Sequence, residues 1–403
     1  MLSSPARFAG MAPRRPIPRV RPDLVAAVVG AVASGLLFLL AHRSLIDDAY
    51  ITLTYARNVA FHLHWGVIEQ QTSNTATSPL NVWLLAAVTM LVRQPVVAVG
   101  VILMATSAAA AVWSARTARQ AGVSWVAPVL TVFGLLASPL LGSTIGLETF
   151  IAASLVIGLA YYAVLGRPVA AGLLVLTRPD LVVFAAVAVL GVAALRRQMV
   201  LVAGIAVLVV LPWHLISWVQ LGSALPDTFL LKTGGEKWGD SYDFANGWQL
   251  YGQAYPTATV LAAGPAVLGL LCLAAWMAPA LRRAVPDGHA VVVVTGIGGL
   301  AHLAAFAALG TAPYHWYYGP SVAGLTCCAA FTAATQLVTA PRRCVGHRTA
   351  GHTGDHQRGL RTGSGYAVDR RSDHHELGAA RPVRAGRNRL GRQRGRSDDL
   401  KSG

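Results

Sequence analysis

A series of long apolar runs constrains the fold of this chain more than any other feature. Of its 403 residues, 54% are hydrophobic and only 12% are charged, which is about half the charged share of an ordinary globular domain. The mean hydropathy is +0.52. Such a chain is suited to lipid as its main solvent, and this excludes a secreted disulfide scaffold, a coiled coil and an ordinary cytosolic enzyme. The runs lie near residues 24–41, 80–92, 95–113, 123–142, 149–165, 168–195, 200–218, 257–280, 289–309 and 319–339.

The runs predict an all-α fold, a polytopic transmembrane helix bundle of about nine to eleven spans over residues 24–340. A basic segment, residues 1–23 with a net charge of +4, precedes the bundle, and a basic tail, residues 341–403 with a net charge of +9, follows it. The 317 residues between them carry only +3. The basic excess therefore indicates anionic lipid at the cytoplasmic face and no nucleic-acid partner.

The positive-inside rule predicts the orientation of the C-terminal half. The pairs at 196–197, 282–283 and 342–343 are all Arg-Arg, so we expect them inside and the long loops 43–79 and 219–256 outside. The middle leaves two alternatives. Arg116, Arg119 and Arg167 are external if every run spans once, and internal if residues 80–113 cross once or include a re-entrant piece.

The tail and the cysteines carry less information. Residues 341–403 are rich in Arg, Gly, His and Asp without periodicity, which is typical of a disordered cytoplasmic tail. The alternative is translation of a GC-rich gene in a wrong frame, with loss of the native C-terminal part. The four cysteines form no CxxC pair near histidines, so we predict neither a disulfide framework nor a zinc site.

Two adjacent acids, Asp47 and Asp48, follow the first apolar run and open a segment that reads as an amphipathic helix to Leu63. One interpretation is structural, with Asp47 as N-cap and Asp48 complementing the helix dipole. The other is functional, with one carboxylate at the membrane edge as general base for an attacking hydroxyl. The pair also leaves open a divalent cation, Mg²⁺ or Mn²⁺.

Further candidates follow along the chain. Residues 72–79 form a hydroxyl-rich strip, predicted either as a turn and cap or as a binding site for sugar hydroxyls. Glu148 begins a span, where an acid is also favoured by the helix dipole. Arg178 and Asp180 flank Pro179 inside an apolar run. Charges there are costly and point to function by default, and the two side chains could also pair with each other.

Cations and aromatic residues complete the set. Lys232, a rare lysine beside an apolar segment, suits a lipid-linked phosphate leaving group, or else it snorkels to the interface. Residues 313–318, PYHWYY, form either an interfacial aromatic belt or a stacking site with His315 as a phosphate partner. The sequence has no Walker loop, GxGxxG turn or HExxH helix. This favours a lipid-borne donor over a nucleotide.

The ordered set of these motifs resembles the GT-C fold glycosyltransferases, in particular the polytopic bacterial members that include the actinobacterial cell-wall arabinofuranosyltransferases. The resemblance spans residues 24–340. Two departures stand out, because relatives often continue into further spans or an external domain, and residues 61–65 lack the glycine-rich turn common after the first external helix. The motifs are IDDAYI at 46–51 with YARN at 55–58, TSPL at 77–80, GLET at 146–149, TRPD at 177–180, PDTF at 226–229 with Lys232, and HWYY at 315–318.

The resemblance implies an inverting transfer of a sugar, which is arabinofuranose by the nearest likeness, from a polyprenyl-phosphate donor to a cell-envelope glycan or glycolipid, on the outer face of the plasma membrane. The competing hypotheses are a transporter or flippase of a lipid-linked sugar and an inactive truncated relative. The predicted base is Asp47 or Asp48, and the predicted phosphate partners are Lys232, Arg178 and His315. The predicted substrate-binding residues are Tyr50, Arg57, Asn74, Thr77, Ser78, Glu148, Asp180, Asp227, Trp316 and Tyr317.

Overall fold

The computed structural model describes residues 21–167, 170–232, 237–239, 241–284 and 288–344, and over these ranges it contains helices and no β-strand. The all-α prediction is confirmed for this part of the chain. Two compact units divide the protein, residues 1–349 and 350–403, and every described residue belongs to the first. The predicted basic tail lies almost wholly outside the described residues, although the last helix continues through Cys344.

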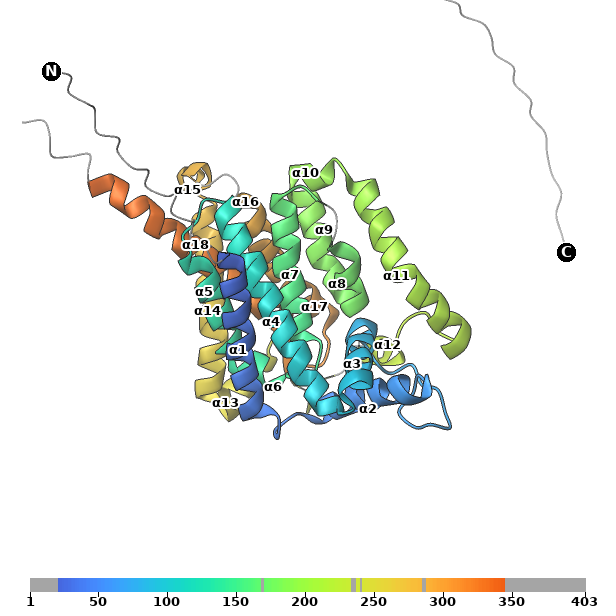
Figure 1. Cartoon of the computed structure of the whole chain (residues 1–403). Helices are drawn as coiled ribbons and strands as arrows, with labels where there is room; N and C mark the ends of the chain where they lie inside the picture. The colour runs from blue at the N-terminus through green and yellow to red at the C-terminus, as the bar shows by residue number, and fades with distance from the viewer. Residues whose placement is uncertain (1–20, 168–169, 233–236, 240, 285–287, 345–403) are drawn as a thin grey trace, which may run out of the picture. The chain divides into compact units, whose positions relative to one another are not determined.

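The helices follow one another with few long connections (Figure 1). The predicted loops 43–79 and 219–256 are themselves partly helical, because α2 lies in the first and α12 and α13 lie in the second. The helices are α1 (Pro22–Ala41), α2 (Asp47–His62), α3 (Pro79–Val92), α4 (Pro95–Gln120), α5 (Val126–Leu136), α6 (Pro139–Ser143), α7 (Thr149–Val164), α8 (Ala171–Thr177), η1 (Pro179–Leu181), α9 (Val182–Gly191), α10 (Ala193–Arg196), α11 (Met199–Leu221), α12 (Asp227–Lys232), α13 (Gly247–Ala254), α14 (Pro256–Trp276), α15 (Pro279–Ala284), α16 (Gly288–Val291), η2 (Val292–Ile297), α17 (Gly298–Leu309) and α18 (His315–Cys344).

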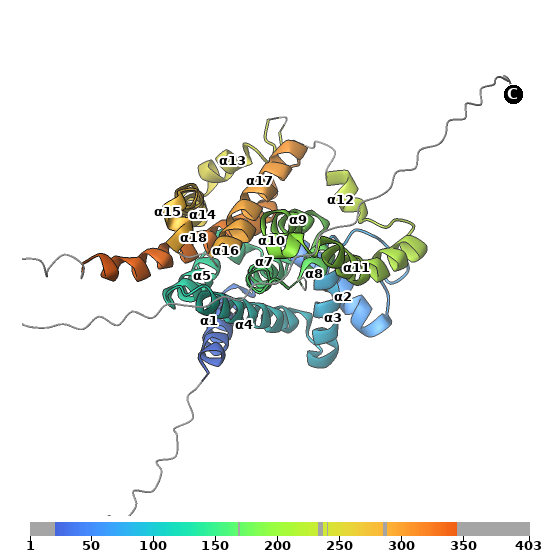
Figure 2. The ribbon, with the colours of Figure 1, turned by 90° about the horizontal axis from the view of Figure 1, so that it is seen from above.

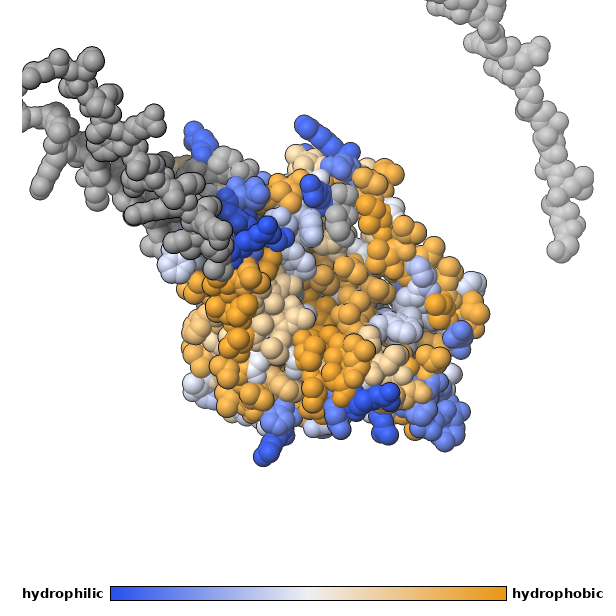
Figure 3. Space-filling view, viewed as in Figure 1, coloured by the Kyte–Doolittle hydropathy of each residue, from blue (hydrophilic) through white to orange (hydrophobic). Residues whose placement is uncertain are grey.

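Five helical segments are long and apolar enough to cross a membrane: α1, α4, α11, α14 and the continuous stretch α16–η2–α17. Shorter apolar helices, α3, α5, α7 and the η1–α9 piece, accompany them. The visible face carries a broad hydrophobic band between hydrophilic residues at both ends (Figure 3). These features are compatible with a multi-pass membrane protein, and the count of about nine to eleven spans stays a prediction.

Helix α7 lies at the centre of the bundle, with α4, α8, α16 and α18 packed around it (Figures 1 and 2). Its residues from Thr149 through Ala160 are all buried. A helix that is apolar around its whole circumference is expected in such a position. By contrast, α1 and α11 bury little of their apolar surface against other helices, so they offer it to lipid.

An ion-pair cluster joins the start of α1 to the end of α4. Asp23, at the start of α1, lies 3.0 Å from Arg116 Nε and 2.8 Å from Arg119 Nη2 in the last turns of α4. Helices α1 and α4 are therefore antiparallel neighbours, and the chain passes from the end of α1 to the start of α4 through α2 and α3. Arg116 and Arg119 thus lie on the same side as the start of α1, and a single crossing by residues 80–113 stays a prediction.

Small residues allow the long helices of the C-terminal half to approach closely. Gly269 of α14 packs directly on the backbone of Leu325 in α18, and a Cβ at this glycine would overlap the Leu325 carbonyl oxygen. Gly264 lies on the same helix, and a Cβ built there meets nothing within 4 Å. The close contact between α14 and α18 at Leu325 thus depends on the absence of a side chain at Gly269, and Gly264 takes no part in it.

We expect Gly269→Val to lower the stability of the folded protein in detergent by about 1–3 kcal/mol, because the new side chain forces α14 away from α18. Gly264→Val introduces the same residue at an unobstructed site and serves as control. Thermal unfolding followed by size-exclusion chromatography measures both. Equal melting temperatures for the two variants would contradict the predicted close packing.

Candidate functional site

Helix α2 has the amphipathic character that its sequence predicts. Ala49, Leu53 and Ala56 form its buried stripe, while Tyr50 is 46% exposed. The N-cap position is occupied by Ile46, so the prediction of Asp47 as N-cap is wrong. Both acids lie in the first turn of the helix, where a negative charge complements the helix dipole.

The hydroxyl-rich strip is fixed against α2. The Tyr55 hydroxyl lies 2.7 Å from Thr75 Oγ1 and also hydrogen-bonds to Ser73. Ser78 occupies the N-cap position of α3 and Pro79 its first turn, as expected for a turn and cap, but the Ser78 side chain makes no capping hydrogen bond. The strip is thus held by α2, which leaves the side chain of Ser78 available to other partners.

Asn74 joins the two segments that were predicted to be external loops. Its side-chain amide donates to Ser217 Oγ and to the carbonyl oxygens of Ser223 and Leu225, at 3.0–3.2 Å. Thr228 Oγ1 donates to the carbonyl oxygen of Thr75 at 2.8 Å. These bonds fix α12, and with it Lys232, beside the strip.

A polar cleft of about 110 Å³ opens where these segments meet. Asp48 lines it from α2 and Lys232 from α12, and Glu148 enters it at the start of α7. The remaining lining combines hydroxyl groups, aromatic rings and apolar side chains, namely Ile51, Thr52, Tyr55, Thr75, Ala76, Thr77, Ser78, Val82, Leu147, Thr228, Trp316 and Tyr317. Hydroxyl and aromatic groups in a concave site are suited to a sugar.

Lys232 contributes a positively charged ammonium group to the lining of this cleft. Its Nζ lies 4.3 Å from the centre of the Tyr314 ring and 5.6 Å from that of Trp316. Among the described residues no carboxylate lies within ion-pair distance of it. The aromatic rings therefore orient the ammonium group by cation–π attraction and leave its N–H donors for another ligand.

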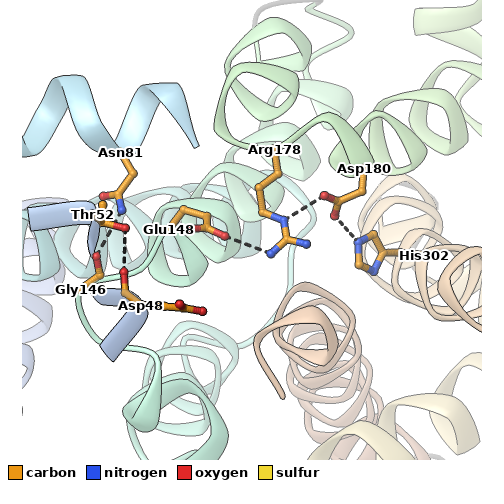
Figure 4. A network of polar contacts seen from close by, with 8 residues as sticks. All are labelled: Asp48, Thr52, Asn81, Gly146, Glu148, Arg178, Asp180 and His302. Carbon is orange, nitrogen blue, oxygen red and sulfur yellow. Dashed lines mark hydrogen bonds and ion pairs between the residues drawn. The ribbon is translucent and has the colours of Figure 1, made fainter. Parts of the chain in front are cut away.

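A chain of buried ionic contacts lies next to the cleft (Figure 4). Arg178 Nη1 donates to Glu148 Oε1 at 3.0 Å, and Arg178 Nε donates to Asp180 Oδ1 at 2.9 Å. Asp180 Oδ2 lies 2.8 Å from His302 Nε2, and His302 Nδ1 lies 2.8 Å from Ser321 Oγ. The pairing of Arg178 with Asp180 was anticipated, whereas the bonds to Glu148 and His302 were not.

The broken helix makes this chain of contacts possible. Helix α8 ends at Thr177, Arg178 adopts an extended backbone, and η1 begins at Pro179, as expected since proline cannot continue the preceding helix. Arg178 is only 4% exposed, as is Glu148, and its guanidinium lies 4.8 Å from the Tyr317 ring centre. Arg178 and Asp180 line a small pocket that shares Thr77, Lys232 and Tyr317 with the cleft.

Gly146 brings Glu148 into position. Its φ of +98° favours glycine, and a Cβ there would lie 2.9 Å from the Cβ of Ala49 in α2. Asn81 Nδ2 donates to the Gly146 carbonyl oxygen at 3.2 Å. The GLET segment therefore passes close beneath α2, and this puts Glu148 on the same cleft wall as Asp48 (Figure 4).

His315 belongs to a different cavity. It lines an apolar groove of about 430 Å³ between α13, α14, α6 and the first turns of α18. Tyr251, in the same groove, donates from its hydroxyl to the Pro313 carbonyl oxygen at 2.6 Å. Burial raises the pKa of Tyr251 to about 12, so the hydroxyl remains protonated at neutral pH.

The cleft thus collects seven of the residues predicted for the site and leaves the others elsewhere. Arg178 and Asp180 lie in the adjoining pocket, and Asn74 is engaged by the loop of residues 223–225. Outside the cleft lining are Asp47, Tyr50, Arg57, Asp227 and His315. The cleft residues predicted from the sequence are Asp48, Thr77, Ser78, Glu148, Lys232, Trp316 and Tyr317.

The sequence analysis did not assign Thr52, Tyr55 or His302 to the site, although Tyr55 belongs to the YARN motif. Thr52 and Tyr55 follow Asp48 at helical spacing, so periodicity counted from Asp48 would have found them. His302 is an ionisable residue within an apolar run, which is itself a signal of function.

No group of three or more His, Cys, Asp or Glu side chains suited to a metal ion occurs in the described part of the chain.

Comparisons with protein-family models, curated proteins and solved structures find no match for this chain.

We expect Arg178→Met to destabilise the protein by roughly 3–5 kcal/mol, because it leaves the carboxylates of Glu148 and Asp180 buried without their cation. Arg93→Met removes an exposed arginine whose guanidinium lies 5.6 Å from the centre of the Phe61 ring and should cost less than about 1 kcal/mol. Loss of folded protein on heating in detergent measures the difference. Comparable losses in the two variants would show that the ionic chain does not stabilise the fold.

Proposed function

We propose that the protein is a membrane glycosyltransferase that moves a sugar from a polyprenyl-phosphate donor to a cell-envelope acceptor. The observation that supports it is the cleft, in which a carboxylate from α2 and an ammonium group from α12 share a wall with hydroxyl and aromatic side chains. A general base, a phosphate ligand and a sugar platform are the parts that such a transfer requires. The proposal includes a GT-C-like fold in the plasma membrane, with the cleft on its outer side.

In this reaction Asp48 accepts the proton of an acceptor hydroxyl. The hydroxyl oxygen forms a bond to the anomeric carbon of the donor sugar while the bond from that carbon to the phosphate oxygen breaks. A single displacement inverts the anomeric configuration. Glu148, whose Oε1 is held by Arg178, offers a fixed carboxylate to a sugar hydroxyl, and the rings of Trp316 and Tyr317 offer stacking surfaces.

Lys232 stabilises the leaving group. Polyprenyl phosphate departs as an anion, and a cation that is already oriented by aromatic rings lowers the free energy of the transition state without reorganisation. The small pocket behind Lys232 presents Arg178 and Thr77, so a phosphate displaced toward it meets further donors. Because phosphate is a good leaving group, positioning and charge stabilisation supply most of the acceleration.

A flippase or transporter of a lipid-linked sugar is the second candidate, and the helix break at residues 177–181 with its buried charges favours it. The two functions differ in their product. Transfer joins the sugar to an acceptor, whereas transport moves intact donor between leaflets. An assay that separates glycosylated acceptor from translocated donor decides between them.

Asp48→Asn should lower kcat for sugar transfer by about 10²–10⁴-fold with little change in the amount of protein, because the amide cannot accept the proton. Asp47→Asn is the matched control, since it changes the neighbouring acid outside the cleft lining, and it should retain at least about half of the activity. Membranes supplied with radiolabelled polyprenyl-phosphate arabinose and an oligosaccharide acceptor provide the assay. Equal activity in both variants would remove Asp48 from the mechanism.

Lys232→Met should reduce kcat by roughly 10²–10³-fold, because the departing phosphate loses its stabilising charge. Lys237→Met, which changes an exposed lysine of the same segment, should leave the rate within about twofold. The same labelled assay measures both rates. A Lys232→Met enzyme that is as fast as wild type would contradict the assignment of the leaving-group site.

A further inference from the structure

We propose that the apolar groove lined by His315 binds the lipid chain of the acceptor, so that the protein uses a glycolipid in preference to a free glycan. The inference rests on the proposed glycosyl transfer and deepens it. The groove, at about 430 Å³, falls within the range of about 300–1,000 Å³ that is typical of small-molecule sites. Its lining is almost wholly apolar and aromatic, which is suited to an acyl or isoprenoid chain.

The groove follows a helix that is long and apolar enough to span the membrane. Ala258 and Ala262 line it from α14 at helical spacing, with Thr259 and Ala263 beside them, and Tyr255 lines it from the N-cap position of this helix. Small side chains on this face leave the space that bulkier residues would fill. Trp248 and Tyr251 of α13 line it as well, beyond the start of α14. A lipid chain that enters from the bilayer therefore lies along α14 with its polar head near the cleft.

The first turn of α18 separates the groove from the cleft. Trp316 and Tyr317 line the cleft, whereas His315 and Tyr318, the flanking residues of the same turn, line the groove. The start of α2 is shared in the same way, since Ile46 lines the groove and Asp48 the cleft. The proposed base thus lies at the boundary of the two cavities.

This arrangement assigns the groove to the acceptor. In a single displacement the attacking oxygen and the leaving oxygen lie on opposite sides of the anomeric carbon. Lys232, which receives the leaving phosphate, lines the cleft and the small pocket but not the groove. Figures 1 and 2 both show α12 well apart from α13 and α14. The donor chain continues from the phosphate on the Lys232 side, so the cavity beyond Asp48 belongs to the molecule that attacks.

An unsatisfied polar atom belongs to one of the residues that line the groove. His315 Nε2 is buried and has no hydrogen-bond partner among the described residues. A buried ring nitrogen without a partner is costly, and it is satisfied when a ligand brings a hydroxyl or an ester oxygen to it. The junction between the sugar and the lipid chain of a glycolipid provides such a group.

Filling the groove tests the proposal. Ala258→Trp places a large side chain in the cavity, and Val260→Trp places the same residue on an exposed position of α14. We expect Ala258→Trp to raise the KM for a diacylglycerol-linked oligosaccharide about tenfold, with the donor KM and kcat within about twofold of wild type. Transfer to the same oligosaccharide without its lipid should be unaffected. A raised donor KM, or no change in either KM, would overturn the proposal.

A second measurement does not require transfer and so separates this inference from the proposed function. The full-length protein in nanodiscs is irradiated with a glycosyl diacylglycerol that carries a diazirine in one acyl chain. We expect labelled peptides from α13 and α14, reduced at least about fivefold by Ala258→Trp but not by Val260→Trp. Phosphatidylcholine with the same diazirine should label these peptides weakly. Equal labelling by both lipids, or none by the glycolipid, would overturn the proposal even if the enzyme transfers sugar.

Discussion

The interaction on which the rest of the site depends is the fork of Arg178 between two carboxylates. An arginine at this depth is tolerated only when its charge is matched and its donors are satisfied. Glu148 from α7 and Asp180 from η1 meet both conditions, and His302 extends the contact to α17. The break between α8 and η1, the central helix α7, and helices α17 and α18 are thereby joined at one point. The cleft depends on this interaction because Glu148, which Arg178 holds in place, is one of its lining residues.

A second constraint is the close approach of backbone to backbone. Gly146 lets the start of α7 pass beneath α2, and Gly269 lets α14 lie against α18. The first contact places Glu148 next to α2, and the second holds together α14 and α18, two of the helices that line the apolar groove. Chemistry at the membrane edge thus relies on positions that carry no functional group, because fixed helices hold reacting groups more firmly than loops do.

Much of the fold and part of the candidate site could be predicted from the sequence. The rest could not be predicted, for physical reasons. Apolar runs located the helices, and TRPD predicted the break between α8 and η1. The residues of the cleft come from segments far apart in the chain, and ordered motifs pointed to seven of them. Periodicity could not show that His315 and Trp316 face different cavities, because that depends on the rotation of α18 in the bundle. Nor could it show that Asn74 joins residues 223–225, since that bond spans about 150 positions.

The shared turn of α18 ties the two cavities to one helical register. Successive residues of an α-helix are rotated by about 100° around its axis. An insertion or deletion of one residue in the connection at 310–314 that shifted the register of α18 would therefore rotate His315 and Trp316 together, in the same sense, away from the cavities that they line. Both cavities would be lost together. The length of that five-residue connection is thus constrained by both cavities, although none of its residues lines the cleft or the groove and Thr311 lines only the adjoining small pocket.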